Sequence, residues 1–131
     1  MQEVYKFLKD ANIFYVGTVE GNQPRVRPFG ALNVFEDKLY ILTNNKKEVY
    51  KQIKNNNKVE ICTYNGKEWI RIECQLVEDE SKVAKKDFLD HNEYLRKMYS
   101  EDDDLTVVFY INNAKATFTS FETHESKEIR F

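Results

Sequence analysis

The sequence predicts an α+β protein of mainly β structure: a small antiparallel β-barrel, closed or partly closed, with short flanking helices. In most of the chain apolar residues alternate with polar ones, which is the pattern of half-buried strands. Short turn sequences such as Gly21-Asn22 separate these runs, as they do in β-hairpins. Strands joined in this way favour a barrel, because closure removes the exposed strand edges that promote aggregation.

The first part of the chain predicts one helix followed by three strands. Val4, Phe7, Leu8 and Ala11 share one face of a helix that ends at Asn12. The alternating pattern then indicates strands over residues 13–20, 24–35 and 39–43.

The rest of the chain predicts a short helix, two strands, a helical segment and a final hairpin. Val49 and Ile53 have helical spacing, and three asparagines end that helix. The acidic, lysine-rich segment 78–104 indicates one or two helices, with these candidate buried positions: Val83, Phe88, Leu89, Leu95 and Met98. Strands are expected over residues 59–64, 68–77, 105–111 and 114–121, with Asn112-Asn113 as the last turn.

Length and charge limit the classes of function. The 131 residues suit one domain over residues 1–131. The 20 Lys and Arg against 22 Asp and Glu leave a net charge of -2, so the overall charge attracts neither nucleic acid nor an anionic membrane. The chain shows no signal peptide and no apolar run of the roughly 20 residues that cross a membrane. We expect a cytoplasmic protein in which any anion site is local.

Neither a metal site nor a catalytic group stands out. Cys62 and Cys74 lie in separate strands without a Cys-x-x-Cys or His-rich setting, so we expect reduced core thiols and no metal. His91 and His124 have no neighbouring nucleophile or ligand spacing, and we expect both at the surface. The sequence therefore assigns no catalytic residue.

Two positive clusters are the candidates for a binding site. Arg25 and Arg27, two apart in a strand, project from the same face, which either binds an anion or is solvated. Lys46 and Lys47 stand where a helix begins, and unpaired N–H groups and the positive end of the helix dipole repel lysines there.

The lysine cluster has two interpretations. Either both lysines extend into water and Asn45 caps the helix, or the helix start, a lysine, Thr43 and Arg27 bind a phosphate. We favour the phosphate, because a tight turn between the second and third strands would place Arg27 beside the end of the third strand.

The order of these motifs resembles a known family. The stretch GNQPRVRPFGALNVFEDKLYILTNNKKEVYKQIKNNNKVEI and the later EWIRIECQL resemble the FMN-binding split barrels related to pyridoxamine 5′-phosphate oxidase. The most similar members are the small bacterial 5-nitroimidazole-resistance proteins. In the oxidase an arginine lies sixteen residues before a strand-ending Thr-Asn, and Arg27 stands in that relation to Thr43.

The resemblance implies a split barrel that binds FMN, with Arg27 and either Lys46 or Lys47 on the phosphate and Trp69 near the flavin. The cofactor-binding residues that it implies are Arg25, Val26, Arg27, Pro28, Thr43, Asn44, Asn45, Lys46, Lys47 and Trp69. Two departures from the family pattern are Asn56-Asn57 in place of Asn-Pro, and Cys74 in place of a glycine. The chain lacks a convincing equivalent of the oxidase's substrate-binding extension, so we do not infer vitamin B6 oxidation.

The resemblance also implies a homodimer with FMN at the subunit interface and an oxidoreductase that acts on a small electron acceptor, with nitro compounds as candidates. Two alternatives stay open. The same fold could bind haem or a deazaflavin, or the barrel could be a non-enzymatic module for single-stranded nucleic acid. Aromatic-rich strands fit the latter, whereas the acidic balance and the lack of an extended basic groove oppose it.

Overall fold

The computed structural model describes all 131 residues, as eight strands, three α-helices and one 3₁₀ helix. The strands are β1 (Phe14–Glu20), β2 (Gln23–Phe29), β3 (Asn33–Phe35), β4 (Lys38–Asn44), β5 (Lys58–Tyr64), β6 (Glu68–Asp79), β7 (Thr106–Ser120) and β8 (Ser126–Arg130). The helices are α1 (Gln2–Ala11), α2 (Glu48–Asn55), α3 (Lys82–Asp90) and the 3₁₀ helix η1 (Glu93–Lys97). The predicted class, an antiparallel α+β split barrel, is confirmed.

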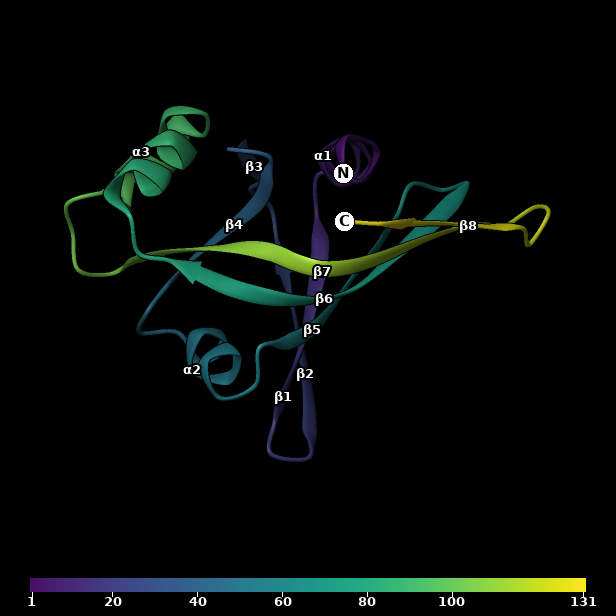
Figure 1. Ribbon diagram of the computed structural model, residues 1–131, viewed down its shortest axis with the longest axis horizontal. Helices are drawn as coiled ribbons and strands as arrows, with labels where there is room; N and C mark the ends of the chain where they lie inside the picture. The colour runs from purple at the N-terminus through teal and green to yellow at the C-terminus, as the bar shows by residue number, and fades with distance from the viewer.

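The strands form one antiparallel sheet in the order β2-β1-β5-β6-β7-β4-β3, with β8 also paired to β7. Figure 1 shows the long strands β6 and β7 crossing the whole molecule, so that they join its two halves. The β1–β2 hairpin projects from one side, α3 covers the far end of β3 and β4, and the two termini lie close together near α1 (Figure 1). The longest helix, α1, has 10 residues, and none of the helices could span a membrane.

Two apolar clusters form the core. The larger lies inside the curved sheet and is closed by α1 and α2, whose Val4, Leu8 and Ile53 are almost fully buried. The smaller lies under α3, where Phe88 packs with Tyr40 and other side chains of β4 and β7. The opposite face of β1, β5, β6 and β7 carries the alternate side chains of these strands, which are exposed or half-buried. We call this the uncovered sheet face.

The predicted second strand, 24–35, is two strands that belong to opposite ends of the sheet. β2 pairs only with β1, whereas β3 pairs with β4, and residues 30–32 connect them. The expected hairpin between the Arg27 strand and the third strand was therefore wrong, although Arg27 and Thr43, at the end of β4, still line one pocket. Gly30 and the connecting residues allow the chain to leave one edge of the sheet and join the other.

The predicted hairpin at Asn112-Asn113 is a bulge inside one continuous strand, β7. The register against β6 shifts here: Gln75 pairs with Asn112, and Glu73 pairs with Lys115. Asn113 has a φ of 51°, a left-handed conformation that asparagine adopts in bulges as well as in turns. The chain reverses later, and the unpredicted strand β8 returns along β7.

The segment 78–104 forms α3 and η1, as expected, but two of its predicted core residues are not buried. Val83 is 64% and Met98 69% exposed. Cys62, expected in the core, lies exposed on the uncovered sheet face, and only Cys74 is buried. In each case the spacing of apolar residues placed the side chain in the core, but the folded chain leaves that side chain exposed.

Candidate functional site

A pocket of about 280 Å³ brings together residues that are distant in the sequence. Arg27 and Pro28 belong to the edge strand β2, Thr43 lies near the end of β4, and Lys47 directly precedes α2. The far wall is apolar and aromatic, and comes from η1 and the residues after it: Tyr94, Leu95, Met98 and Tyr99. We call this cavity the Arg27 pocket.

The guanidinium of Arg27 is fixed by neutral acceptors. Nη1 donates to the Thr18 hydroxyl at 2.7 Å and to the Val16 carbonyl at 3.1 Å, and has a longer contact of 3.5 Å with the Arg25 carbonyl. Nη2 donates to Gln52 Oε1 at 2.6 Å. These groups belong to β1, β2 and α2, so three elements together hold the cation in one orientation.

One edge of this guanidinium remains available. A guanidinium carries five N–H groups. The Nε–H and one N–H of Nη2 donate to no group of the chain. They belong to neighbouring nitrogens, the arrangement that binds phosphate or carboxylate through two parallel hydrogen bonds.

The charge of Arg27 is not neutralised within the chain. Burial, and secondly the positive charge of Arg25, lowers the pKa of the Arg27 guanidinium, and no carboxylate acts on it. An arginine nevertheless stays protonated in proteins. The pocket therefore contains a partly buried cation without an anionic partner, which is the electrostatic condition for anion binding.

The start of α2 adds a second source of positive potential. Asn44 Oδ1 accepts hydrogen bonds from the backbone N–H of Lys46 at 2.9 Å and of Lys47 at 3.2 Å. The turn that these hydrogen bonds stabilise ends at Lys47, the N-cap residue of α2, and no side chain caps the helix. The first-turn N–H groups therefore lack a side-chain acceptor and favour an anion.

Asn45 does not act as the helix cap that one interpretation of the sequence expected. Its Nδ2 donates to the Asp104 carbonyl at 2.6 Å, and its backbone N–H donates to the Leu105 carbonyl. Asn45 thus attaches the segment before α2 to the loop before β7. Its role in the structure is to hold this segment in place.

Four of the residues predicted for the site line the Arg27 pocket together: Arg27, Pro28, Thr43 and Lys47. Lys46 does not line it. Trp69 lies on the uncovered sheet face and packs against Phe121, with 4.6 Å between ring centroids. Within one chain, Trp69 therefore lies apart from the four predicted residues that share the pocket.

Arg25 and Val26 lie outside the Arg27 pocket. Arg25 forms an exposed ion pair with Glu20 at 3.0 Å. Val26, which is 68% exposed, alternates with the two arginines and so projects from the other face of β2.

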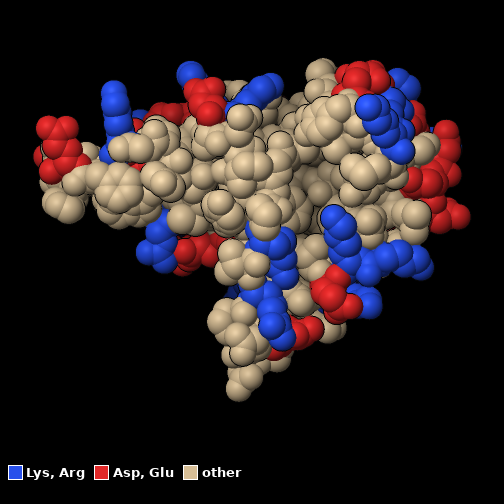
Figure 2. Space-filling view, turned by 180° about the vertical axis from the view of Figure 1, so that it is seen from behind, with Lys and Arg blue, Asp and Glu red and all other residues tan.

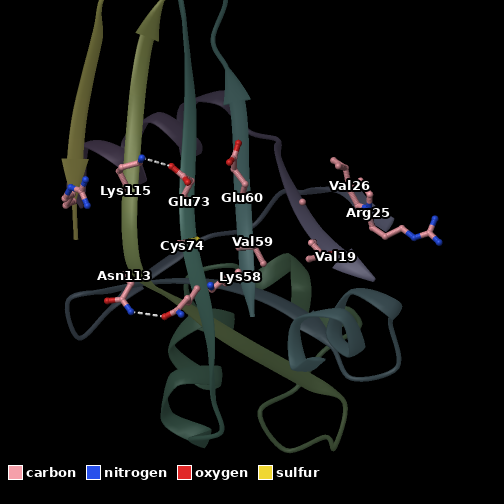
Figure 3. Close-up of a pocket in the computed structure, with 15 residues that line it drawn as sticks. Val19, Arg25, Val26, Lys58, Val59, Glu60, Glu73, Cys74, Asn113 and Lys115 are labelled. Atoms are coloured by element: carbon pink, nitrogen blue, oxygen red, sulfur yellow. Dashed lines mark hydrogen bonds and ion pairs between the residues drawn. The ribbon is translucent and has the colours of Figure 1, made fainter. Parts of the chain in front are cut away.

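A larger hollow of about 670 Å³ lies on the uncovered sheet face, and Val26 contributes to its rim. Figure 3 shows that Lys115 points to Glu73, an ion pair of 2.8 Å, and that the Arg25 side chain extends away from the sheet. This hollow is wide and open, and each of its lysines and arginines except Lys58 pairs with a carboxylate. It is therefore a weaker candidate for an anion site than the smaller Arg27 pocket.

Gln52 and Thr18 were not singled out from the sequence, although a signal was present. Gln52 falls on the same helical face as Val49 and Ile53, and it is only 4% exposed. Thr18 continues the inward alternation of β1 and is 2% exposed. A polar residue at a position that periodicity assigns to the core needs a hydrogen-bond partner, and here that partner is Arg27.

Known structures resemble this fold over nearly the whole chain. A NimC/NimA family protein from Clostridium acetobutylicum has 40% sequence identity and a TM-score of 0.92, over 98% of this chain and 93% of that one. A pyridoxamine 5′-phosphate oxidase-related FMN-binding protein from Nostoc punctiforme has 14% identity and a TM-score of 0.67, over 99% and 93%. A FAD-binding protein from Mesorhizobium loti has 12% identity and a TM-score of 0.61, over 91% and 94%.

At their low identity, the latter two proteins support the fold alone. No curated protein matches the chain. The sequence profile described as pyridoxamine 5′-phosphate oxidase matches residues 1–120. With that match and the 40% identity to the NimC/NimA protein, the chain belongs to the pyridoxamine 5′-phosphate oxidase family.

Proposed function

We propose that this protein binds FMN and that the Arg27 pocket holds the phosphate of the cofactor. The observation that carries the proposal is the Arg27 guanidinium, which is fixed on one edge by neutral groups and keeps two N–H groups and its charge for a ligand. Thr43, Lys47 and the uncapped start of α2 would supply the other groups that bind the phosphate. A terminal phosphate carries about -1.5 to -2 charges at neutral pH, which suits these donors.

The relatives agree with this choice of ligand class. The protein from Nostoc punctiforme is described as FMN-binding and that from Mesorhizobium loti as FAD-binding. We favour FMN because the site offers one compact group of donors, which matches a single terminal phosphate.

We propose further that the protein is a homodimer and that the second subunit completes the flavin site. The Arg27 pocket, at about 280 Å³, is smaller than the roughly 300–1,000 Å³ that pockets for such ligands occupy. The uncovered sheet face also exposes an aromatic cluster of Tyr64, Trp69 and Phe121. A partner that covers this face would remove apolar surface from water.

The proposed activity is electron transfer to a small acceptor. Bound FMN would supply the redox chemistry, while the chain binds and orients it. Nitro compounds are the candidate acceptors, because the sequence resembles the small bacterial 5-nitroimidazole-resistance proteins. We assign no residue of the chain to proton transfer.

The surface charge counts against the alternative of a nucleic-acid-binding module. On the face shown in Figure 2, Lys and Arg side chains are interspersed with Asp and Glu side chains, and a broad uncharged area lies between them. Single-stranded nucleic acid requires a continuous basic groove with stacking aromatic side chains. The acidic net charge of -2 points the same way.

The proposal is tested by purifying the protein without added cofactor, recording its visible spectrum and identifying any released chromophore by mass. We expect FMN, or a colourless protein that takes up FMN when it is added. Haem or a deazaflavin would replace the proposal with the alternative cofactor, and failure to take up FMN would overturn it.

A further inference from the structure

We infer that Gln52 is a positioning residue that holds the Arg27 guanidinium in its ligand-binding orientation and leaves its positive charge available. The inference rests on the proposed phosphate site, and concerns a residue that does not line the Arg27 pocket. It assigns to a buried glutamine of α2 a role in selecting a phosphorylated ligand.

The geometry places Gln52 Oε1 at the centre of a small buried network. It accepts one hydrogen bond from Arg27 Nη2 at 2.6 Å and one from the Thr18 hydroxyl at 2.5 Å. The same hydroxyl accepts from Arg27 Nη1 at 2.7 Å. Gln52 and Thr18 together therefore occupy one edge of the guanidinium, and the remaining donors belong to the other edge.

The amide also has an electrostatic consequence. A carboxylate at this position would form a charge-assisted pair with Arg27 and cancel its charge. The amide gives the guanidinium a hydrogen-bond acceptor without a negative charge, so the field of the cation reaches the pocket. At position 52 glutamine thus supports Arg27 while leaving it without a counterion in the chain.

Gln52 also connects the two halves of the proposed site. It lies in the helix that begins directly after Lys47, and it contacts the arginine of the edge strand β2. Since β2 has only β1 as a neighbour in the sheet, the position of Arg27 relative to Lys47 depends on contacts such as this one. Gln52 is therefore the side chain that links the position of Arg27 to the helix that begins after Lys47.

The test compares the affinities of FMN and riboflavin, which differ in the phosphate alone, for the unmodified protein and three variants. Gln52→Glu keeps the shape and the acceptor but adds a charge. Gln52→Met keeps the length but removes the acceptor. Asn55→Asp adds the same charge at an exposed position of α2 and is the matched control.

In the unmodified protein we expect FMN to bind at least about a hundredfold more tightly than riboflavin. Gln52→Glu should reduce this ratio at least about tenfold, by weakening FMN alone, and Gln52→Met should reduce it severalfold. Asn55→Asp should keep it. A purely structural role of Gln52 would change the two affinities equally.

The outcomes separate this inference from the proposed function. An unmodified protein that binds both flavins equally overturns the phosphate site itself. An unmodified protein that prefers FMN, with that preference retained in either Gln52 variant, overturns the positioning role. If Gln52→Met fails to fold, the comparison rests on Gln52→Glu and on Thr18→Val, which removes the hydroxyl that bonds both Gln52 and Arg27 and should reduce the ratio severalfold.

Discussion

Replacing Arg27 with methionine tests the phosphate site most directly. Methionine keeps an unbranched apolar stem and removes the guanidinium, including the two N–H groups that no acceptor of the chain uses. Hydrogen bonds to charged groups contribute about 1.5–3 kcal/mol each, so two of them would stabilise bound FMN by about 3–6 kcal/mol. Hydrogen bonds from water and Lys47 would replace part of this stabilisation. We therefore expect FMN to bind to Arg27→Met about a hundredfold more weakly, a loss of about 2.7 kcal/mol in binding free energy.

The same structure predicts what should not change. Riboflavin lacks the phosphate, so its affinity for Arg27→Met should stay within about threefold of that for the unmodified protein. Arg25→Met is the matched control on the same strand, because Arg25 forms an exposed pair with Glu20. Exposed pairs contribute about 0–1 kcal/mol, so this variant should keep both its stability and its preference for FMN.

The assay is a fluorescence or calorimetric titration of FMN and riboflavin against the three proteins, after circular dichroism has confirmed that each is folded. Arg27→Met also leaves the Val16 carbonyl without its side-chain donor, so its unfolding free energy is measured alongside. Equal weakening of FMN and riboflavin would show that Arg27 acts through the fold. An unchanged preference for FMN in Arg27→Met would refute the reasoning.

Three further predictions concern assembly and stability. If the flavin site is shared, dilution should release flavin as the dimer dissociates, and sedimentation with absorbance detection should find no flavin-bound monomer. Tyr40→Phe removes a hydrogen bond of 2.8 Å to Asp79 and should cost about 1–2 kcal/mol in urea unfolding at pH 7. Burial alone would raise the pKa of Asp79, but hydrogen bonds from Ser81 and Tyr40 lower this pKa overall. The lowered pKa adds stability above a pH of about 3.9, and this stability is lost as acid protonates Asp79. The loss of unfolding free energy caused by Tyr40→Phe should therefore shrink in acid, and a loss that stays constant with pH would contradict this. Asn113 has a φ of 51°, which disfavours branched side chains. Asn113→Gly should therefore leave the free energy of unfolding nearly unchanged, whereas Asn113→Val should lower it by about 1–2 kcal/mol. Equal melting temperatures of the two variants would count against strain at the bulge.

The local sequence was sufficient for the fold class and for part of the candidate site. Periodicity predicts α1, α2 and most strands, because the side of an element that is buried is determined by the spacing of its own apolar residues. The order of motifs led to the family, which the match over residues 1–120 confirmed. The sixteen-residue relation between Arg27 and Thr43 predicted two residues that line one pocket.

Only the tertiary structure decided which strands pair and which side chains share the pocket. Pairing partners depend on contacts between distant segments, so residues 24–35 could contribute to both ends of the sheet without any local signal beyond Gly30. Asn113 has the same left-handed preference in a turn and in a bulge, and the partner strand β6 selects the bulge. The sequence alone could not show that Lys47 rather than Lys46 lines the pocket, or that Gln52 supports Arg27, because both depend on contacts between segments that are distant in the chain.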